Sequence, residues 1–179
     1  MNVNELLEQS IKLLGIQDLT VSAQNTDPRL ACLVNALAVC YLRLITEYAP
    51  LEREESVTVS GGTFDTSTLT EPFFDAVKLA DEKGESAKFR LRGKYIVAED
   101  GTYLLRYDTL PQSYPAIGGT IEVAPQITLP LLARGVAAEY ALASMMYEES
   151  ILHERKYKEG LMKVLTPHAA KHVTVKRWI

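Results

Sequence analysis

The chain has 179 residues, of which 47% are hydrophobic and 23% are charged, and its formal net charge is -4. This composition is typical of a folded globular protein that buries a core without disulfides, and it argues against intrinsic disorder. The negative charge argues against a protein that wraps nucleic acid with its whole surface, because that mode needs a strong excess of Lys and Arg. A protein that only encloses DNA remains compatible with this charge.

The sequence predicts neither a membrane segment nor a disulfide. Its longest uncharged apolar run, residues 30–42, is shorter than the ~20 residues that span a bilayer, and its first residues do not resemble an export signal. Cys32 and Cys40 lie in one predicted helix, about 12 Å apart along its axis, which is too far for a disulfide. We expect both to be core thiols in a reducing compartment.

Two helices are predicted in the first fifty residues. An Asn-x-x-Glu capping box at residues 2–5 and the helix-stopping Gly15 predict a helix over residues 3–14. An Asp-Pro pair at residues 27–28 begins a second helix, whose apolar positions follow the helical period over residues 28–48. Apolar residues occupy both sides of this second helix, so we expect it to be mostly buried.

Strands are predicted between residues 55 and 110, where the apolar period changes to two. One short strand lies around residues 57–59, a hairpin surrounds the polar turn at residues 81–84, and a second hairpin surrounds the Asp-Gly turn at residues 100–101. A small antiparallel sheet of this kind needs a helix or a neighbouring chain against one of its faces.

Residues 129–165 are predicted to form one long helix with two apolar stripes. The first stripe contains Leu132, Val136, Tyr140, Ala143, Tyr147 and Ile151. The opposite stripe contains Leu131, Ala138, Leu142, Met145 and Leu152. Because the rest of a chain of this size can cover one side, we assign the second stripe to a subunit interface. Burial of both stripes within the same domain is the alternative.

The predicted fold is therefore α+β and mainly α, with a helical bundle, an inserted small sheet and an extended tail. A single domain covers residues 1–170, and an arm covers residues 171–179. Arg43 and Glu139 interrupt apolar helical faces, and a partly buried ion pair between their helices would satisfy both charges. We interpret this pair as structural and not as catalytic.

The arm follows the helix breaker Pro167 and carries the single tryptophan of the chain. Trp and Ile gain ~1.5 to 3 kcal/mol or more from burial, so a solvated tail seldom carries them. We predict that the arm docks on a partner, either as an added strand or in a pocket, whereas folding back of Trp178 onto its own domain is the alternative. The predicted docking residues are Val173, Val175, Lys176, Arg177, Trp178 and Ile179.

Sequence patterns of catalysis, metal binding and cofactor binding are not found. His153 and Glu154 begin like a zinc-protease helix, but Tyr157 occupies the position of the second histidine, so a surface pair on a helix is the better interpretation. His168 and His172 are four residues apart without an accompanying cluster of Cys, Asp or Glu. We expect no enzymatic activity, no catalytic residue, no metal and no cofactor.

Several segments resemble the head-tail connector, or neck adaptor, proteins of tailed bacteriophages. The main one is Ala-Arg-Gly-Val-Ala-Ala-Glu-Tyr-Ala-Leu at residues 133–142, with Met-Tyr-Glu-Glu at 146–149 and Arg-Lys-Tyr-Lys at 155–158 behind it. The hairpin region over residues 74–111 and the basic aromatic Lys-Arg-Trp at residues 176–178 complete the resemblance. Ala141 stands where family members often carry a bulky or thiol residue.

This resemblance implies a virion protein, made in the cytoplasm of the host bacterium, that joins the capsid to the tail. It implies a homo-oligomeric ring, commonly of twelve subunits, docked beneath the portal protein and in contact with the next neck or tail protein. DNA would pass through the lumen without sequence-specific binding, and no membrane would be involved. A soluble helical regulator or small-ligand binder is the competing hypothesis, and an enzyme of unrecognised type is a third.

Overall fold

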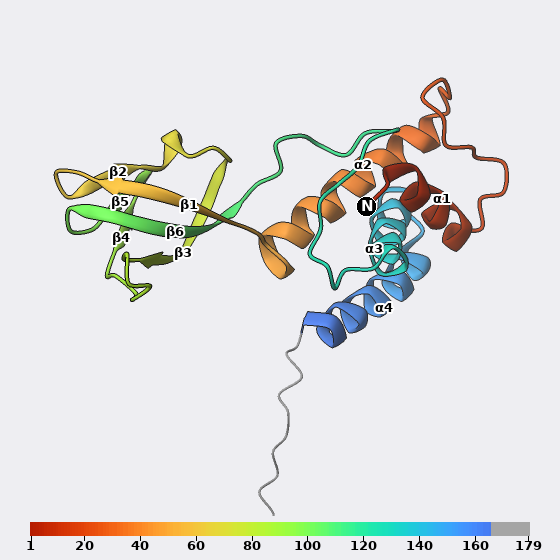
Figure 1. Cartoon of the computed structure of the whole chain (residues 1–179). Coiled ribbons are helices and arrows are strands. Elements are labelled where there is room, and N and C mark those ends of the chain that lie inside the picture. Colours follow the sequence, from red (N-terminus) through yellow and green to blue (C-terminus); the bar gives the residue numbers. More distant parts are fainter. Residues whose placement is uncertain (166–179) are drawn as a thin grey trace, which may run out of the picture.

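The computed structural model describes residues 1–165, which form a helical lobe and a β lobe lying end to end (Figure 1). The fold is α+β, with two small antiparallel sheets inserted between the second and third helices. The helical lobe contains α1 (Val3–Leu14), α2 (Pro28–Arg43), a π-helical turn η1 (Leu44–Tyr48), α3 (Leu129–Ala143) and α4 (Tyr147–Leu165). The β lobe contains β1 (Leu51–Val59), β2 (Thr63–Asp65), a 3-10 turn η2 (Thr66–Thr68), β3 (Phe73–Ala80), β4 (Arg90–Arg92), β5 (Tyr95–Val97) and β6 (Gly101–Thr109).

The beginnings of α1 and α2 and the end of α1 lie at the predicted capping residues. The Asn2 side chain accepts hydrogen bonds from the backbone N–H groups of Asn4 and Glu5, at 2.8 Å and 3.2 Å. Gly15 ends α1 with a φ of 69°, a left-handed conformation that glycine adopts without a steric penalty. The Asp27 side chain accepts from the N–H of Arg29 at 2.8 Å and so begins α2.

The segment from α2 through η1 has the length and the apolar composition of a membrane-spanning helix. Core helices of globular proteins pass the same test, and here Leu33, Leu37 and Leu44 are completely buried against the rest of the helical lobe. The segment therefore serves as a core element of this lobe.

The region after residue 129 differs from the predicted single helix. Met145 has a φ of 61° and is the one non-glycine residue with a positive φ among the described residues. The N–H of Met146 donates to the carbonyl oxygen of Ala141 at 2.8 Å, and the N–H of Met145 donates to that of Leu142 at 3.1 Å. This pair of bonds is a Schellman motif, which ends α3 and lets α4 fold back against it.

Small residues place α3 at the centre of the helical lobe, where it packs against α1, α2 and α4. Its buried small residues are Ala133, Gly135, Ala137, Ala138 and Ala141. A Cβ atom on Gly135 would lie 2.5 Å from Cys40 Sγ of α2 and 2.9 Å from the Tyr157 ring of α4. The glycine therefore lets α2 and α4 approach α3 closely at the same level, which accounts physically for the small residues in segment 133–142.

The β lobe contains two three-stranded sheets, ordered β1-β6-β3 and β2-β5-β4, instead of one. The strands at the predicted hairpin turns do not pair as predicted, because β6 pairs with β1 and β3, whereas β5 pairs with β2 and β4. Around the polar turn at residues 81–84, a single bridge joins Ala80 to Ser86. The two sheets share a core of Val57, Leu79, Ile96, Leu105 and Tyr107, separate from that of the helical lobe.

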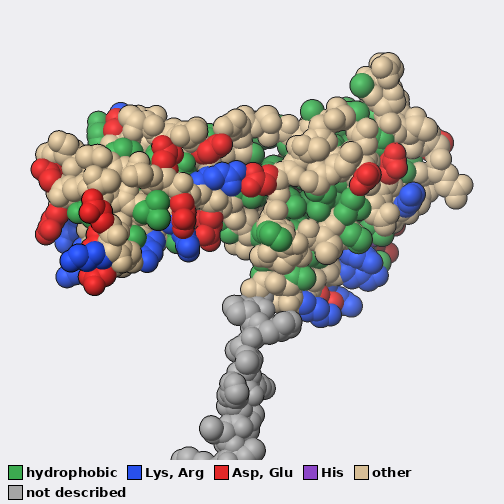
Figure 2. All heavy atoms as spheres, viewed as in Figure 1, with side chains coloured by type: hydrophobic (Ala, Val, Ile, Leu, Met, Phe, Trp, Pro, Cys, Tyr) green, Lys and Arg blue, Asp and Glu red, His purple; other side chains and the backbone are tan. Residues whose placement is uncertain are grey.

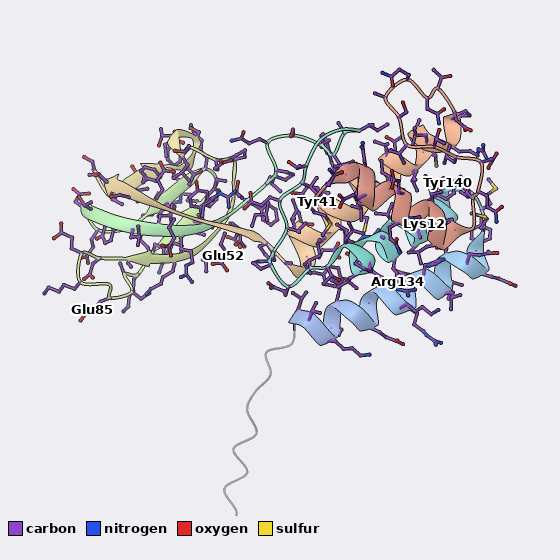
Figure 3. The ribbon with its side chains drawn as sticks, turned by 45° about the vertical axis from the view of Figure 1, so that its right-hand side comes forward. Lys12, Tyr41, Glu52, Glu85, Arg134 and Tyr140 are labelled. Carbon is purple, nitrogen blue, oxygen red and sulfur yellow. The ribbon has the colours of Figure 1, made fainter. Side chains whose placement is uncertain are left out.

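A long connection over residues 110–128 returns the chain from the β lobe and is held by the helical lobe. The N–H of Val3 donates to the carbonyl oxygen of Gly119 at 3.1 Å, and the Tyr41 hydroxyl of α2 donates to that of Glu122 at 2.8 Å (Figure 3). The Glu122 carboxylate also lies 2.6 Å from the guanidinium of Arg53 on β1. This connection therefore contacts both lobes at the place where they meet.

Candidate functional site

Exposed apolar side chains gather where α3 turns into α4, and we call this set the elbow surface. Its residues are Leu142, Met145, Tyr147, Ile151 and Leu152, with exposed fractions between 47% and 76%. The surrounding helices are firmly packed, since α3 is buried on most sides and Ser150 Oγ of α4 donates to the carbonyl oxygen of Ala138 at 3.0 Å. An apolar cluster of this kind on a packed scaffold is typical of a protein interaction site.

The predicted subunit interface is wrong at two of its five residues. Leu131 and Ala138 are buried inside the chain, with 8% and 5% exposure, because α4 folds back over this side of α3. The other three predicted interface residues, Leu142, Met145 and Leu152, are exposed. Tyr147 and Ile151, assigned to the stripe on the opposite side, are exposed as well, because the turn at residues 144–146 separates them from Leu132 and its buried neighbours.

A groove of about 330 Å³ runs beside the elbow surface at the junction of α2, α3 and α4. Its lining residues are Arg43, Ala138, Glu139, Leu142, Tyr147, Ser150, Ile151 and Glu154. The predicted ion pair is present in this groove, with Arg43 Nη1 2.6 Å from Glu139 Oε1. The Glu139 side chain is only 15% exposed, so its carboxylate depends on Arg43 for compensation of its charge.

The charges around the elbow surface divide along α4. Glu148 and Glu149 are exposed in its first turn, next to the apolar residues of the elbow. Further along the helix, Lys158 Nζ lies 2.7 Å from Glu154 Oε1, and Lys and Arg side chains gather over this part of the lobe (Figure 2). The elbow therefore combines an apolar surface with an acidic margin.

His153 lies beneath the elbow and not on the surface, which corrects the predicted surface pair with Glu154. It is buried between α4 and α3, and its Nδ1 has no hydrogen-bond partner among the described residues. Burial, together with the nearby charges of Arg134 and Lys156, lowers the pKa of His153 below its ordinary value; Arg134 lies on the side of α3 that faces α4 (Figure 3). The side chain is consequently a neutral core histidine at neutral pH.

The buried Cys40 thiol and Tyr157 hydroxyl have a packing role. Burial raises the pKa of the Cys40 thiol to about 12, so this group stays protonated and is a poor nucleophile. Burial also raises the pKa of the Tyr157 hydroxyl, which lies beside Cys40. Within residues 1–165 no group of three or more His, Cys, Asp or Glu side chains is arranged to hold a metal ion.

A second exposed apolar set lies on the β lobe, and we call it the sheet patch. It consists of Phe74 and Val77 on β3 and Leu104 on the neighbouring β6, each between 44% and 46% exposed. The bulged pairing of β3 with β6, with register shifts at both Phe74 and Val77, accounts for two apolar side chains outside the core. Thus each lobe carries its own apolar surface.

Other predicted residues lie outside the described residues. These are the six docking residues of the arm, Val173, Val175, Lys176, Arg177, Trp178 and Ile179, together with His168 and His172. No protein-family model matches the chain, and no curated protein is similar enough to count as a relative.

Proposed function

We propose that this chain is a non-enzymatic structural protein of a bacteriophage virion, a head-tail connector that forms a ring beneath the portal. The observation that carries the proposal is the elbow surface. Full burial of one large apolar side chain stabilises by ~1.5 to 3 kcal/mol, so covering five that are between 47% and 76% exposed contributes roughly 5 kcal/mol before the costs of association. This gain offsets part of the cost of association, and a template such as a portal ring, which orders the subunits, would reduce the remaining cost.

The arrangement of the two lobes supports a ring. A ring of identical subunits needs two different surfaces on each subunit, one for each neighbour. The elbow surface on the helical lobe and the sheet patch on the β lobe are two such surfaces, well separated along the molecule (Figure 1). In this proposal the partners are other copies of the chain, the portal protein and the next neck or tail protein.

The passage of DNA fits the same proposal. A net charge of -4 would not retain DNA, because tight retention requires many Lys and Arg contacts to phosphates. We therefore propose a lumen through which DNA passes without sequence-specific binding, in a ring of about twelve subunits, a number taken from the family resemblance.

Electron microscopy of the purified protein mixed with portal rings tests this function. We expect additional density beneath the portal with the unaltered protein, and loss of this density with Ile151→Glu at the elbow surface. Leu91→Glu on β4 is the matched control, since Leu91 is an exposed apolar residue outside both surfaces. Absence of attachment by the unaltered protein, or equal effects of the two variants, would contradict the proposal.

Removal of residues 176–179 tests the arm separately. We expect the fold to remain intact and docking to the portal to weaken, because the arm is proposed to contact a partner. Circular dichroism measures the fold, and co-sedimentation with portal rings measures docking. A global loss of helicity would show that these residues belong to the core instead.

One observation favours the alternative function of a small-ligand binder. A groove of about 620 Å³, lined by Ile11, Ile16, Leu19 and Val21 among others, lies beside the end of α1. This volume is in the range of ligand-binding pockets. A defined small ligand that protects Ile16 and its neighbours from hydrogen exchange, together with failure to bind portal rings, would favour this alternative.

A further inference from the structure

The elbow surface has a complementary segment within its own chain. Residues 166–179 contain the cations Lys171, Lys176 and Arg177, the large apolar residues Trp178 and Ile179, and no Asp or Glu. The elbow offers the opposite charge at Glu148 and Glu149, together with exposed apolar side chains. Apolar residues flanked by cations match an apolar surface that has an acidic margin.

The geometry of α4 places the two within reach. From Leu165 back to Tyr147, α4 extends by 18 residues of ~1.5 Å each, or about 27 Å. An extended chain advances ~3.3 Å per residue, so Lys171 lies up to about 20 Å from Leu165, level with the elbow residue Leu152. Trp178 reaches up to about 43 Å, beyond the first turn of α4, and therefore also reaches the groove beside it.

The order of charges agrees with this direction. Residues 166–170, Thr-Pro-His-Ala-Ala, carry no Lys or Arg and would pass the part of α4 over residues 154–163, where four cations outnumber Glu154 and Glu159. Two of these cations, Arg155 and Lys158, already pair with the two glutamates. The arm cations Lys176 and Arg177, which reach up to about 36 Å and 40 Å from Leu165, would then lie near Glu148 and Glu149, about 24 to 26 Å from Leu165, and would leave Trp178 beside the groove. A chain segment that folds back along α4 would thus be uncharged where it passes the mainly cationic part of the helix. It would carry its cations where it reaches the acidic first turn.

We propose that, in the free protein, residues 171–179 fold back along α4 of the same chain and cover the elbow surface, with Trp178 in the groove beside Tyr147 and Ile151. If the elbow surface forms subunit contacts, as the proposed function requires, the folded-back arm keeps the free protein from self-association. Docking of a neighbouring subunit displaces it and releases it for a different partner.

The single tryptophan of the chain makes this proposal measurable. In the full chain at low concentration, with its monomeric state verified by analytical ultracentrifugation, we expect Trp178 to emit at short wavelength and to be shielded from acrylamide. Ile151→Glu should shift the emission to longer wavelength and increase quenching. Val77→Glu on the sheet patch is the matched control and should change neither, because Val77 is equally apolar and exposed but lies in the other lobe.

A charge exchange provides the second variant. Glu148→Lys with Glu149→Lys should release the arm, and Lys176→Glu with Arg177→Glu added to it should restore the shielded emission. A solvent-exposed Trp178 in the unaltered protein, or burial insensitive to both the elbow and the charge variants, would overturn the proposal. Shielding that grows with protein concentration would also overturn it, because it would place the arm on another copy. None of these readouts involves the portal, so they are independent of the test of ring formation.

Discussion

Gly135→Ala tests whether the close packing at the centre of the helical lobe is essential. The new Cβ would lie 2.5 Å from Cys40 Sγ and 2.9 Å from the Tyr157 ring, both buried and on different helices. Non-bonded atoms prefer ~3.5 to 4.0 Å, so α2 and α4 would both have to move. Overpacking of this kind costs about 3 kcal/mol at its upper range, and the higher helix propensity of Ala returns about 1 kcal/mol. We expect a net loss of about 2 kcal/mol, measured by urea unfolding followed at the helical circular dichroism signal.

Gly160→Ala is the matched control, because Gly160 also lies within a helix. Its Cβ would meet Leu131 Cδ1, the end of a flexible side chain, and no other atom closer than 3.7 Å. We expect this variant to be neutral or more stable by up to about 1 kcal/mol. Cys40→Ala should rescue part of the Gly135→Ala loss in a double-mutant cycle. Equal stability of Gly135→Ala and Gly160→Ala would refute the reasoning.

Three further predictions concern individual residues around the elbow. Glu139→Gln should lower stability by about 1 kcal/mol in a thermal melt, because the Arg43 guanidinium keeps a side-chain oxygen beside it but loses the negative charge that the carboxylate supplied. Met145→Gly should raise the free energy of unfolding in urea by about 1 kcal/mol, because glycine adopts the positive φ without the steric penalty. The lowered pKa of His153 means that the unfolded chain binds the proton first, so stability should fall as the pH drops below about 6.5. His153→Phe should flatten this dependence between about pH 7 and pH 5.

Each of these predictions has an outcome that contradicts it. An unchanged melting temperature in Glu139→Gln would show that the ion pair does not stabilise the fold. A less stable Met145→Gly variant would mean that contacts of the methionine outweigh its backbone strain. Identical pH profiles of the unaltered protein and His153→Phe would assign the acid sensitivity to other groups.

The helix boundaries near the start of the chain could be predicted because local side chains determine them. Asn2 and Asp27 satisfy backbone N–H groups within three residues, and Gly15 supplies a positive φ. The end of α3 carries no such signal, because a methionine occupies the left-handed position where glycine is usual. Folding of α4 onto α3 holds Met145 there, and this tertiary effect is not visible in local sequence.

The pairing of the strands could likewise not be predicted from the sequence. Alternating apolar residues identify which face of a strand is buried, but not the strand with which it pairs. Gly93, with a φ of 59°, joins β4 to β5 and is the turn that the prediction missed. The register shifts around Val77 also interrupt the period of two in β3, and they place an apolar residue outside the core.

The part of the candidate site that could be predicted consists of charged side chains on apolar helix faces, because a buried charge requires a partner. Arg43 and Glu139 required a partner because each interrupts an apolar face, and they pair with each other. The apolar stripes gave no such distinction, since Leu131 and Leu152 are equally apolar but one is buried and the other exposed. Tyr147 and Ile151 belong to the elbow surface, and the neighbouring Glu148 and Glu149 were the available signal of exposure.

The place where the β lobe joins the chain has a consequence for engineering. Leu51 and Thr109, the first residue of β1 and the last of β6, are directly opposite each other in the sheet. The whole insertion therefore enters and leaves through adjacent positions about 5 Å apart. A short turn can replace it without stretching the backbone, and a foreign domain with adjacent ends can be grafted in its place. Because the core of the helical lobe takes only Leu51 from this insertion, grafts that retain Leu51 can display a cargo of choice from an otherwise unaltered scaffold.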